Sequence, residues 1–164
     1  MMHTVAVLNQ KGGVGKTTVT LGLASAAAAA GRRVLVIDLD PQGSSSWVLG
    51  VEPNSVDATV GDVLEKAPIK RAIVPSAWSD LVDVVPATAD LQRLESGQAE
   101  SKRAARLRKA LGANRIDDYE VVLIDCPPSL GNLTTNALTA ARHALVVVEP
   151  SALGLRGIGG VADA

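Results

Sequence analysis

The sequence is poor in aromatic residues and in cysteine. Of its 164 residues, none is phenylalanine, one is tyrosine and two are tryptophan. Hydrophobic residues still make up 47% of the chain, so the core must be built from aliphatic side chains. A lone cysteine, Cys126, excludes an intramolecular disulfide framework and a zinc site made of cysteines. The length predicts a single domain over residues 1–164.

Neither sign of charge is in marked excess. The chain has 16 basic and 17 acidic residues, which gives a net charge of −1. This balance by itself does not indicate a nucleic acid or a membrane surface as partner. The sequence also lacks a basic leader with a small-residue cleavage site, and its uncharged stretch 17–31 is too short and polar to cross a bilayer. We therefore expect a cytoplasmic protein with no membrane partner.

Short apolar runs alternate with stretches that look helical. Four runs are continuous and rich in β-branched residues, as is typical of strands covered on both faces. They lie at 5–8, 34–37, 121–124 and 144–148, with a weaker run at 81–85. Helices are expected at 17–30, 59–66, 90–111 and 133–141, and a loop at 41–53. This alternation predicts an α/β fold with a mostly parallel sheet flanked by helices.

A glycine-rich segment follows the first apolar run and opens the first expected helix. It reads Lys11-Gly12-Gly13-Val14-Gly15-Lys16-Thr17-Thr18. Glycines let the backbone approach phosphates, and the successive N–H groups at a helix N-terminus attract anions. Lys16 is expected to reach the β- and γ-phosphates, and the Thr17 hydroxyl to bind Mg²⁺. Residues 11–18 therefore predict a nucleotide–Mg²⁺ site.

Carboxylates follow two of the expected strands. Asp38 and Asp40 come after run 34–37, where either could orient a water or hold Mg²⁺ through water, or could cap a turn. Asp125 follows run 121–124, which is the Walker B pattern of four apolar residues and an aspartate beside Mg²⁺. Because the carboxyl ends of parallel strands meet at one edge of a sheet, these groups are expected near the glycine-rich loop.

The loop departs from the usual phosphate-loop pattern in an informative way. Gln10 stands where a glycine is usual, and Lys11 adds a second lysine before Gly12. This matches the deviant Walker A motif, K-G-G-x-G-K-[ST], of the MinD/ParA class. D-x-D-P-Q-G at 38–43 and D-C-P-P-S-L-G at 125–131 are similar to further ParA motifs. The sequence resembles the ParA family of partitioning ATPases from Val5 to about Gly160.

The resemblance implies a three-layer P-loop NTPase-like fold that binds and hydrolyses ATP with Mg²⁺. It implies catalytic roles for Lys11, Lys16 and Asp40, and a metal site of Thr17, Asp40 and Asp125. Asp40 matches the water-positioning aspartate, and Lys11 the lysine that reaches the partner's nucleotide in an ATP-dependent homodimer. A ParB-like stimulating protein and non-specific DNA, bound mainly through the C-terminal region, are the implied partners of a switch for chromosome or plasmid segregation. DNA binding would place it on the nucleoid.

Family members are longer than this chain. We therefore expect it to be the N-terminal part of a family domain, with the C-terminal strands missing and residues 149–157 leading into a helix. Two other hypotheses stay open: a non-catalytic remnant that acts as a dimerisation module, and a MinD-like ATPase, against which D-P-Q-G counts. Five basic residues at 102–109 are interpreted as a solvated helix face, with DNA-phosphate contact as the alternative.

Overall fold

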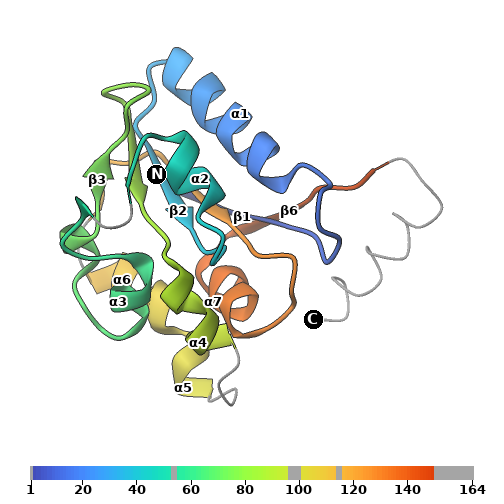
Figure 1. Ribbon diagram of the computed structural model, residues 1–164. Helices are drawn as coiled ribbons and strands as arrows, with labels where there is room; N and C mark the ends of the chain where they lie inside the picture. Colours follow the sequence, from blue (N-terminus) through green and yellow to red (C-terminus); the bar gives the residue numbers. More distant parts are fainter. Residues whose placement is uncertain (1, 53–54, 96–100, 114–115, 150–164) are drawn as a thin grey trace.

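A six-stranded sheet forms the centre of the protein (Figure 1). The computed structural model describes residues 2–52, 55–95, 101–113 and 116–149. The strands lie in the order β3-β4-β2-β5-β1-β6. Their bounds are β1 His3–Leu8, β2 Val34–Asp38, β3 Val74–Pro75, β4 Val82–Val85, β5 Val121–Asp125 and β6 His143–Val146. Every pairing is parallel except that of β3 with β4, so the expected mostly parallel sheet is confirmed.

The strand register gathers the carboxyl ends of four strands at one edge of the sheet. Val7 of β1 and Asp38 of β2 both pair with Asp125 of β5. On the other side of β1, Leu8 pairs with Val146 of β6. The segments that leave β1, β2, β5 and β6 therefore start side by side, which is where open parallel sheets place their ligands.

Helices cover both faces of the sheet, which gives three layers (Figure 1). Side chains of β2 alternate between the two layers of core: Leu35 and Ile37 belong to one cluster, Val34 and Val36 to the other. The first cluster includes α3 (Val60–Leu64), α6 (Arg106–Ala113) and α7 (Asn132–Ala140), and the second includes α1 (Lys16–Ala29). Burial on both faces explains why the strands are continuous apolar runs.

The structure differs from the sequence-based expectations in two segments, a loop and a helix. The segment 41–53 is not all loop, because α2 (Ser44–Val48) begins after Gly43, whose φ of 65° favours glycine. In its described part, the expected helix 90–111 is not one continuous α-helix. It contains η3 (Ala89–Leu91), α4 (Gln92–Glu95), α5 (Ser101–Ala104) and α6, with a 3-10 turn before α4 and a turn at Ala105 between α5 and α6. Glu95, in α4, has its carboxylate bound to Ser129 and to the backbone N–H of Leu133.

The other helices agree with the sequence-based expectations. The helices expected at 17–30, 59–66 and 133–141 correspond to α1, α3 and α7. The helix expected after residues 149–157 lies outside the described residues. Among the helices of the described ranges, none combines the length and the apolar character that crossing a bilayer requires.

Candidate nucleotide site

The glycine-rich loop connects β1 directly to α1. Gly13 and Gly15 have φ angles of 77° and 91°, values that residues with a Cβ atom rarely adopt. Gly15 is the N-cap of α1, and its carbonyl accepts the Val19 N–H at 2.9 Å, so the helix begins immediately after the loop. Gly12 and Thr18 are exposed and Val14 is half-buried. The loop thus presents backbone N–H groups and a helix N-terminus together, an arrangement that attracts phosphate.

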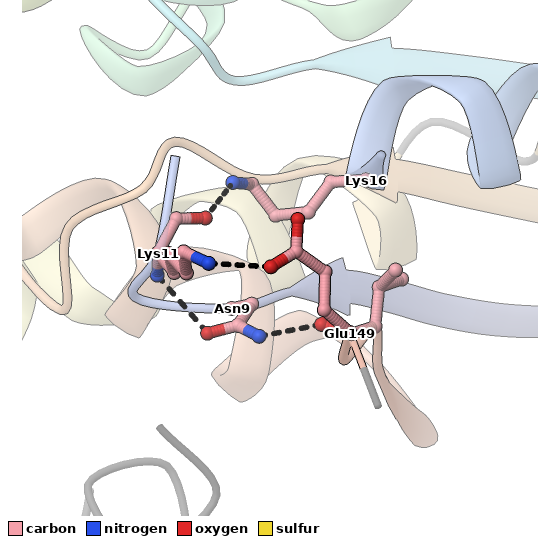
Figure 2. Close-up of polar contacts among 5 residues, drawn as sticks. Asn9, Lys11, Lys16 and Glu149 are labelled. Atoms are coloured by element: carbon pink, nitrogen blue, oxygen red, sulfur yellow. Dashed lines mark hydrogen bonds and ion pairs between the residues drawn. The ribbon is translucent and has the colours of Figure 1, made fainter. Parts of the chain in front are cut away.

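The two lysines of the loop have different surroundings (Figure 2). Lys16 is buried, with 7% of its surface exposed, and its Nζ donates to the Lys11 carbonyl at 3.3 Å. Lys11 is half exposed and forms an ion pair with Glu149, which follows β6. An ion pair this exposed is worth at most about 1 kcal/mol, so a stronger anion can displace it.

Asn9 fixes the start of the loop. This residue is 2% exposed, and its Oδ1 accepts the Lys11 N–H at 3.0 Å. Its Nδ2 donates to the carbonyl of Val147, just beyond β6 (Figure 2). One buried amide therefore connects the loop to the segment that carries Glu149.

Asp125 lies under the loop at the end of β5, with 1% of its surface exposed. Its Oδ2 accepts hydrogen bonds from Thr17 Oγ1 at 2.8 Å and from Ser45 Oγ at 2.5 Å. Burial raises the pKa of the Asp125 carboxyl, the hydrogen bonds from Ser45 and Thr17 lower it, and the nearby Asp40 raises it again. A cation at this place would favour the ionised carboxylate.

Asp38 and Asp40 differ in their burial and in their hydrogen-bond partners. Asp38 is fully buried, and its Oδ2 accepts the N–H and the hydroxyl of Ser46, both at 2.8 Å. Its Oδ1 accepts the Asp40 N–H at 3.1 Å. Asp40 is half-buried, and its Oδ1 accepts the Gln42 N–H at 2.9 Å. Asp38 therefore holds the chain in place, whereas Asp40 keeps part of its carboxylate accessible.

The buried position of Asp38 makes stability depend on pH. Burial is the main cause that raises the pKa of Asp38 to about 7. The folded protein keeps this proton where the unfolded chain has lost it, so the carboxyl stabilises the fold most below pH 4 and this contribution is lost as the pH rises through 7. Asp38→Asn should remove that loss, which is on the order of 4 kcal/mol.

Urea unfolding of the native chain and of Asp38→Asn from pH 4 to 8 measures this effect. The native chain should lose stability relative to the variant as the pH rises. The exposed residue Asp57 provides the control, since Asp57→Asn should follow the native curve. A constant difference between native and Asp38→Asn over this range would contradict the assignment.

The oxygen ligands at this site suit Mg²⁺. The Thr17 hydroxyl and the Asp125 carboxylate are hard oxygen donors, and they lie 2.8 Å apart. Within the described ranges, no group of three His, Cys, Asp or Glu side chains could hold a metal ion. Mg²⁺ commonly binds through one or two protein oxygens and completes its shell with water and phosphate oxygens, so these residues fit an ion that arrives with a nucleotide.

Residues 11–18, Asp40 and Asp125 all lie at the edge of the sheet where the sequence places them. The sequence reasoning missed four residues of the same region: Asn9, Ser45, Ser46 and Glu149. Two signals could have found three of them, Ser45, Ser46 and Glu149. The serines directly follow the D-P-Q-G motif, and Glu149 is an acidic residue that follows a strand with the same direction as β1.

This combination of loop, sheet and carboxylates defines a P-loop nucleotide-binding protein. A family model described as an AAA domain matches residues 2–163. The chain belongs to this family of P-loop ATPases, in its ParA/Soj branch. It is 47% identical over 161 residues to the chromosome partitioning protein ParA of Caulobacter vibrioides, covering 96% of this chain and 60% of that protein.

A second relative and a solved structure are also similar to this chain. The sporulation initiation inhibitor protein Soj of Bacillus subtilis is 40% identical over 159 residues, covering 96% of this chain and 62% of that one. A structure named cobyrinic acid a,c-diamide synthase from Mycobacterium smegmatis, with bound ADP and magnesium, is 38% identical with a TM-score of 0.89, covering 99% and 66%. The chain thus spans about three fifths of the length of these two curated relatives.

Proposed function

We propose that this protein binds and hydrolyses ATP as a partitioning ATPase of ParA type. The observation that carries the proposal is the 2.8 Å hydrogen bond between Thr17, at the start of α1, and Asp125, at the end of β5. It joins the phosphate loop to a buried carboxylate, as a nucleotide–Mg²⁺ site needs. The named partitioning relative supports the partitioning role, and the similar structure with ADP and magnesium supports nucleotide–Mg²⁺ binding.

Phosphate binding is assigned to the loop and its buried lysine. The backbone N–H groups of residues 12–18 and the N-terminus of α1 attract the phosphates. Lys16, held inside the loop, adds a positive charge in surroundings that exclude most water, where charge interactions are stronger than in solvent. Mg²⁺ bound with ATP neutralises phosphate charge, and Thr17 and Asp125 are the residues that would hold it.

Hydrolysis is assigned to positioning by Asp40. Its carboxylate is half-buried, lies near Asp125 and is fixed by the Gln42 N–H. A carboxylate in this position can orient a water for in-line attack on the γ-phosphate. Catalysis is then electrostatic, with slow turnover until a ParB-like protein stimulates it.

A second copy of the chain is the proposed partner for Lys11. Its side chain is 47% exposed at the rim of the loop, so it is available to a nucleotide held by another molecule. In the single chain, Glu149 binds the Lys11 ammonium (Figure 2). This ion pair must open before Lys11 can reach across, and ATP favours that step by supplying a more highly charged anion.

DNA is proposed as a further partner of the ATP-bound dimer, mainly through the C-terminal region of the family domain, with a cytoplasmic and nucleoid location. The basic residues at 102–109 are interpreted as a solvated helix face, and in α6 Arg108 and Lys109 are exposed, in agreement with that interpretation. Arg106 donates to the carbonyl of Leu64 at 2.6 Å, and Leu107 and Leu111 are buried.

Sedimentation velocity with nucleotide tests the dimer. The native chain should be a monomer with ADP–Mg²⁺ and a dimer with ATP–Mg²⁺, because only ATP offers a γ-phosphate to the partner's Lys11. Lys11→Ala should bind nucleotide as the native chain does but remain a monomer. An exposed residue, Lys70, serves as the control, and Lys70→Ala should dimerise normally.

Measurements of ATP turnover and of binding to DNA and to lipid vesicles, made beside sedimentation velocity, give each alternative its own outcome. A dimer that forms without nucleotide and without turnover would indicate the non-catalytic dimerisation module and overturn the enzyme. ATP-dependent binding to lipid vesicles instead of DNA would indicate the MinD-like ATPase. A chain that binds ATP yet stays monomeric would contradict the dimer switch alone.

A further inference from the structure

Two adjacent serines at the start of α2 bind two different buried carboxylates. Ser45 donates to Asp125 at 2.5 Å, whereas Ser46 donates to Asp38 at 2.8 Å. Both serines are fully buried. The start of α2 is therefore fixed at the ends of β5 and β2, immediately after the turn that carries Asp40.

The contacts of the Asp125 carboxylate are unequal. Oδ2 accepts the two short hydrogen bonds, from Thr17 and Ser45, which use both of its lone pairs. Oδ1 accepts a longer bond from Thr20 at 3.4 Å, and the same Thr20 hydroxyl also donates to the Lys16 carbonyl at 3.0 Å. Ser45 and Thr17 thus determine the rotation of the carboxylate and leave Oδ1 the more available oxygen.

We propose that Ser45 is a positioning residue for Mg²⁺, acting through Asp125. Thr17 and Asp125 are the residues that would hold the ion, and the hydrogen bond from Ser45 to Oδ2 would leave Oδ1 of Asp125 available to it. Hydrogen bonds from outside a coordination shell commonly account for a 10–100-fold change in metal affinity. The inference rests on the proposed ATP–Mg²⁺ site and adds a residue from outside the phosphate loop and the Walker B segment.

The neighbouring Ser46 has a structural role, and its contacts differ from those of Ser45. Its hydroxyl binds Asp38 and accepts the Ala87 N–H at 3.0 Å, which ties α2 to the end of β4. Ser45 instead contacts the carboxylate that faces the phosphate loop. Because Asp40 and Ser45 are five residues apart on one short connection, the same contact also links the Asp40 turn to the metal site.

The test measures binding of a fluorescent ADP analogue to the full chain over a series of Mg²⁺ concentrations and in EDTA. Ser45→Ala should raise the Mg²⁺ concentration for half-maximal binding by about 10-fold. Its affinity for the analogue in EDTA should equal that of the native chain, since the loop is intact. Ser44→Ala, at the exposed neighbouring position, should behave as the native chain in both conditions.

Ser45→Cys is a second variant that keeps the size of the side chain with a weaker donor, and it should fall between native and Ser45→Ala. An unchanged Mg²⁺ dependence in Ser45→Ala would overturn the inference while the proposed function stands. Equal losses with Mg²⁺ and with EDTA, or unfolding of both variants, would show that Ser45 only supports the fold and would also overturn it. A native chain that binds no nucleotide would overturn the inference and the proposed function together.

Discussion

Lys16→Ala should abolish tight nucleotide binding, with an affinity at least roughly 30-fold below that of the native chain. Lys16 is 7% exposed, and its ammonium lies 3.3 Å from the Lys11 carbonyl, within the turn of the loop. Removing one partner of a poorly solvated charge pair costs about 2–5 kcal/mol, and each 1.4 kcal/mol is a factor of about ten. The loop backbone is set by Gly13 and Gly15 and should keep its shape.

Fluorescence anisotropy of a labelled ATP analogue measures this loss directly. Lys70→Ala is the matched control, because it removes an exposed lysine far from the loop in sequence. The unfolding transition of Lys16→Ala should remain cooperative, which separates lost binding from lost structure. Native-like affinity in Lys16→Ala would mean that the loop does not hold the phosphates.

Asp40→Asn should lower ATP turnover by about 100-fold or more while the protein still binds ATP and forms the dimer. Asparagine keeps an oxygen that can accept the Gln42 N–H, so the turn after β2 should persist. It removes the negative charge that orients the attacking water, and positioned groups of this kind contribute roughly 10²–10⁴-fold. ATP-bound dimers should therefore accumulate.

Single-turnover phosphate release, measured beside sedimentation velocity, distinguishes the two parts of this prediction. The exposed residue Asp57 again supplies the control, and Asp57→Asn should hydrolyse ATP at the native rate. Turnover that survives in Asp40→Asn would assign water positioning to another group. A variant that fails to bind ATP would give Asp40 a role in binding instead.

Much of the site could be predicted because its motifs are local. Residues 11–18 are contiguous, and the glycines, the lysine and the following helix each have a direct effect on phosphate binding. The continuous apolar runs before Asp38 and Asp125 indicated strands of a parallel sheet, and parallel strands end at a common edge. The sequence pattern did not predict the turn at Ala105 that separates α5 from α6. It also did not predict the contact of Glu95 with Ser129 and Leu133, which are more than 30 positions away.

The sequence by itself determined the phosphate loop, the parallel sheet and the edge where the carboxylates gather, because these depend on neighbouring residues and on strand direction. The tertiary structure alone decided how the two carboxylates at the end of β2, Asp38 and Asp40, differ. Asp38 is buried against Ser46, while Asp40 stays accessible. It also brought Glu149 to Lys11 and Ser45 to Asp125, since those partners lie 138 and 80 residues apart and meet only when the strands pair.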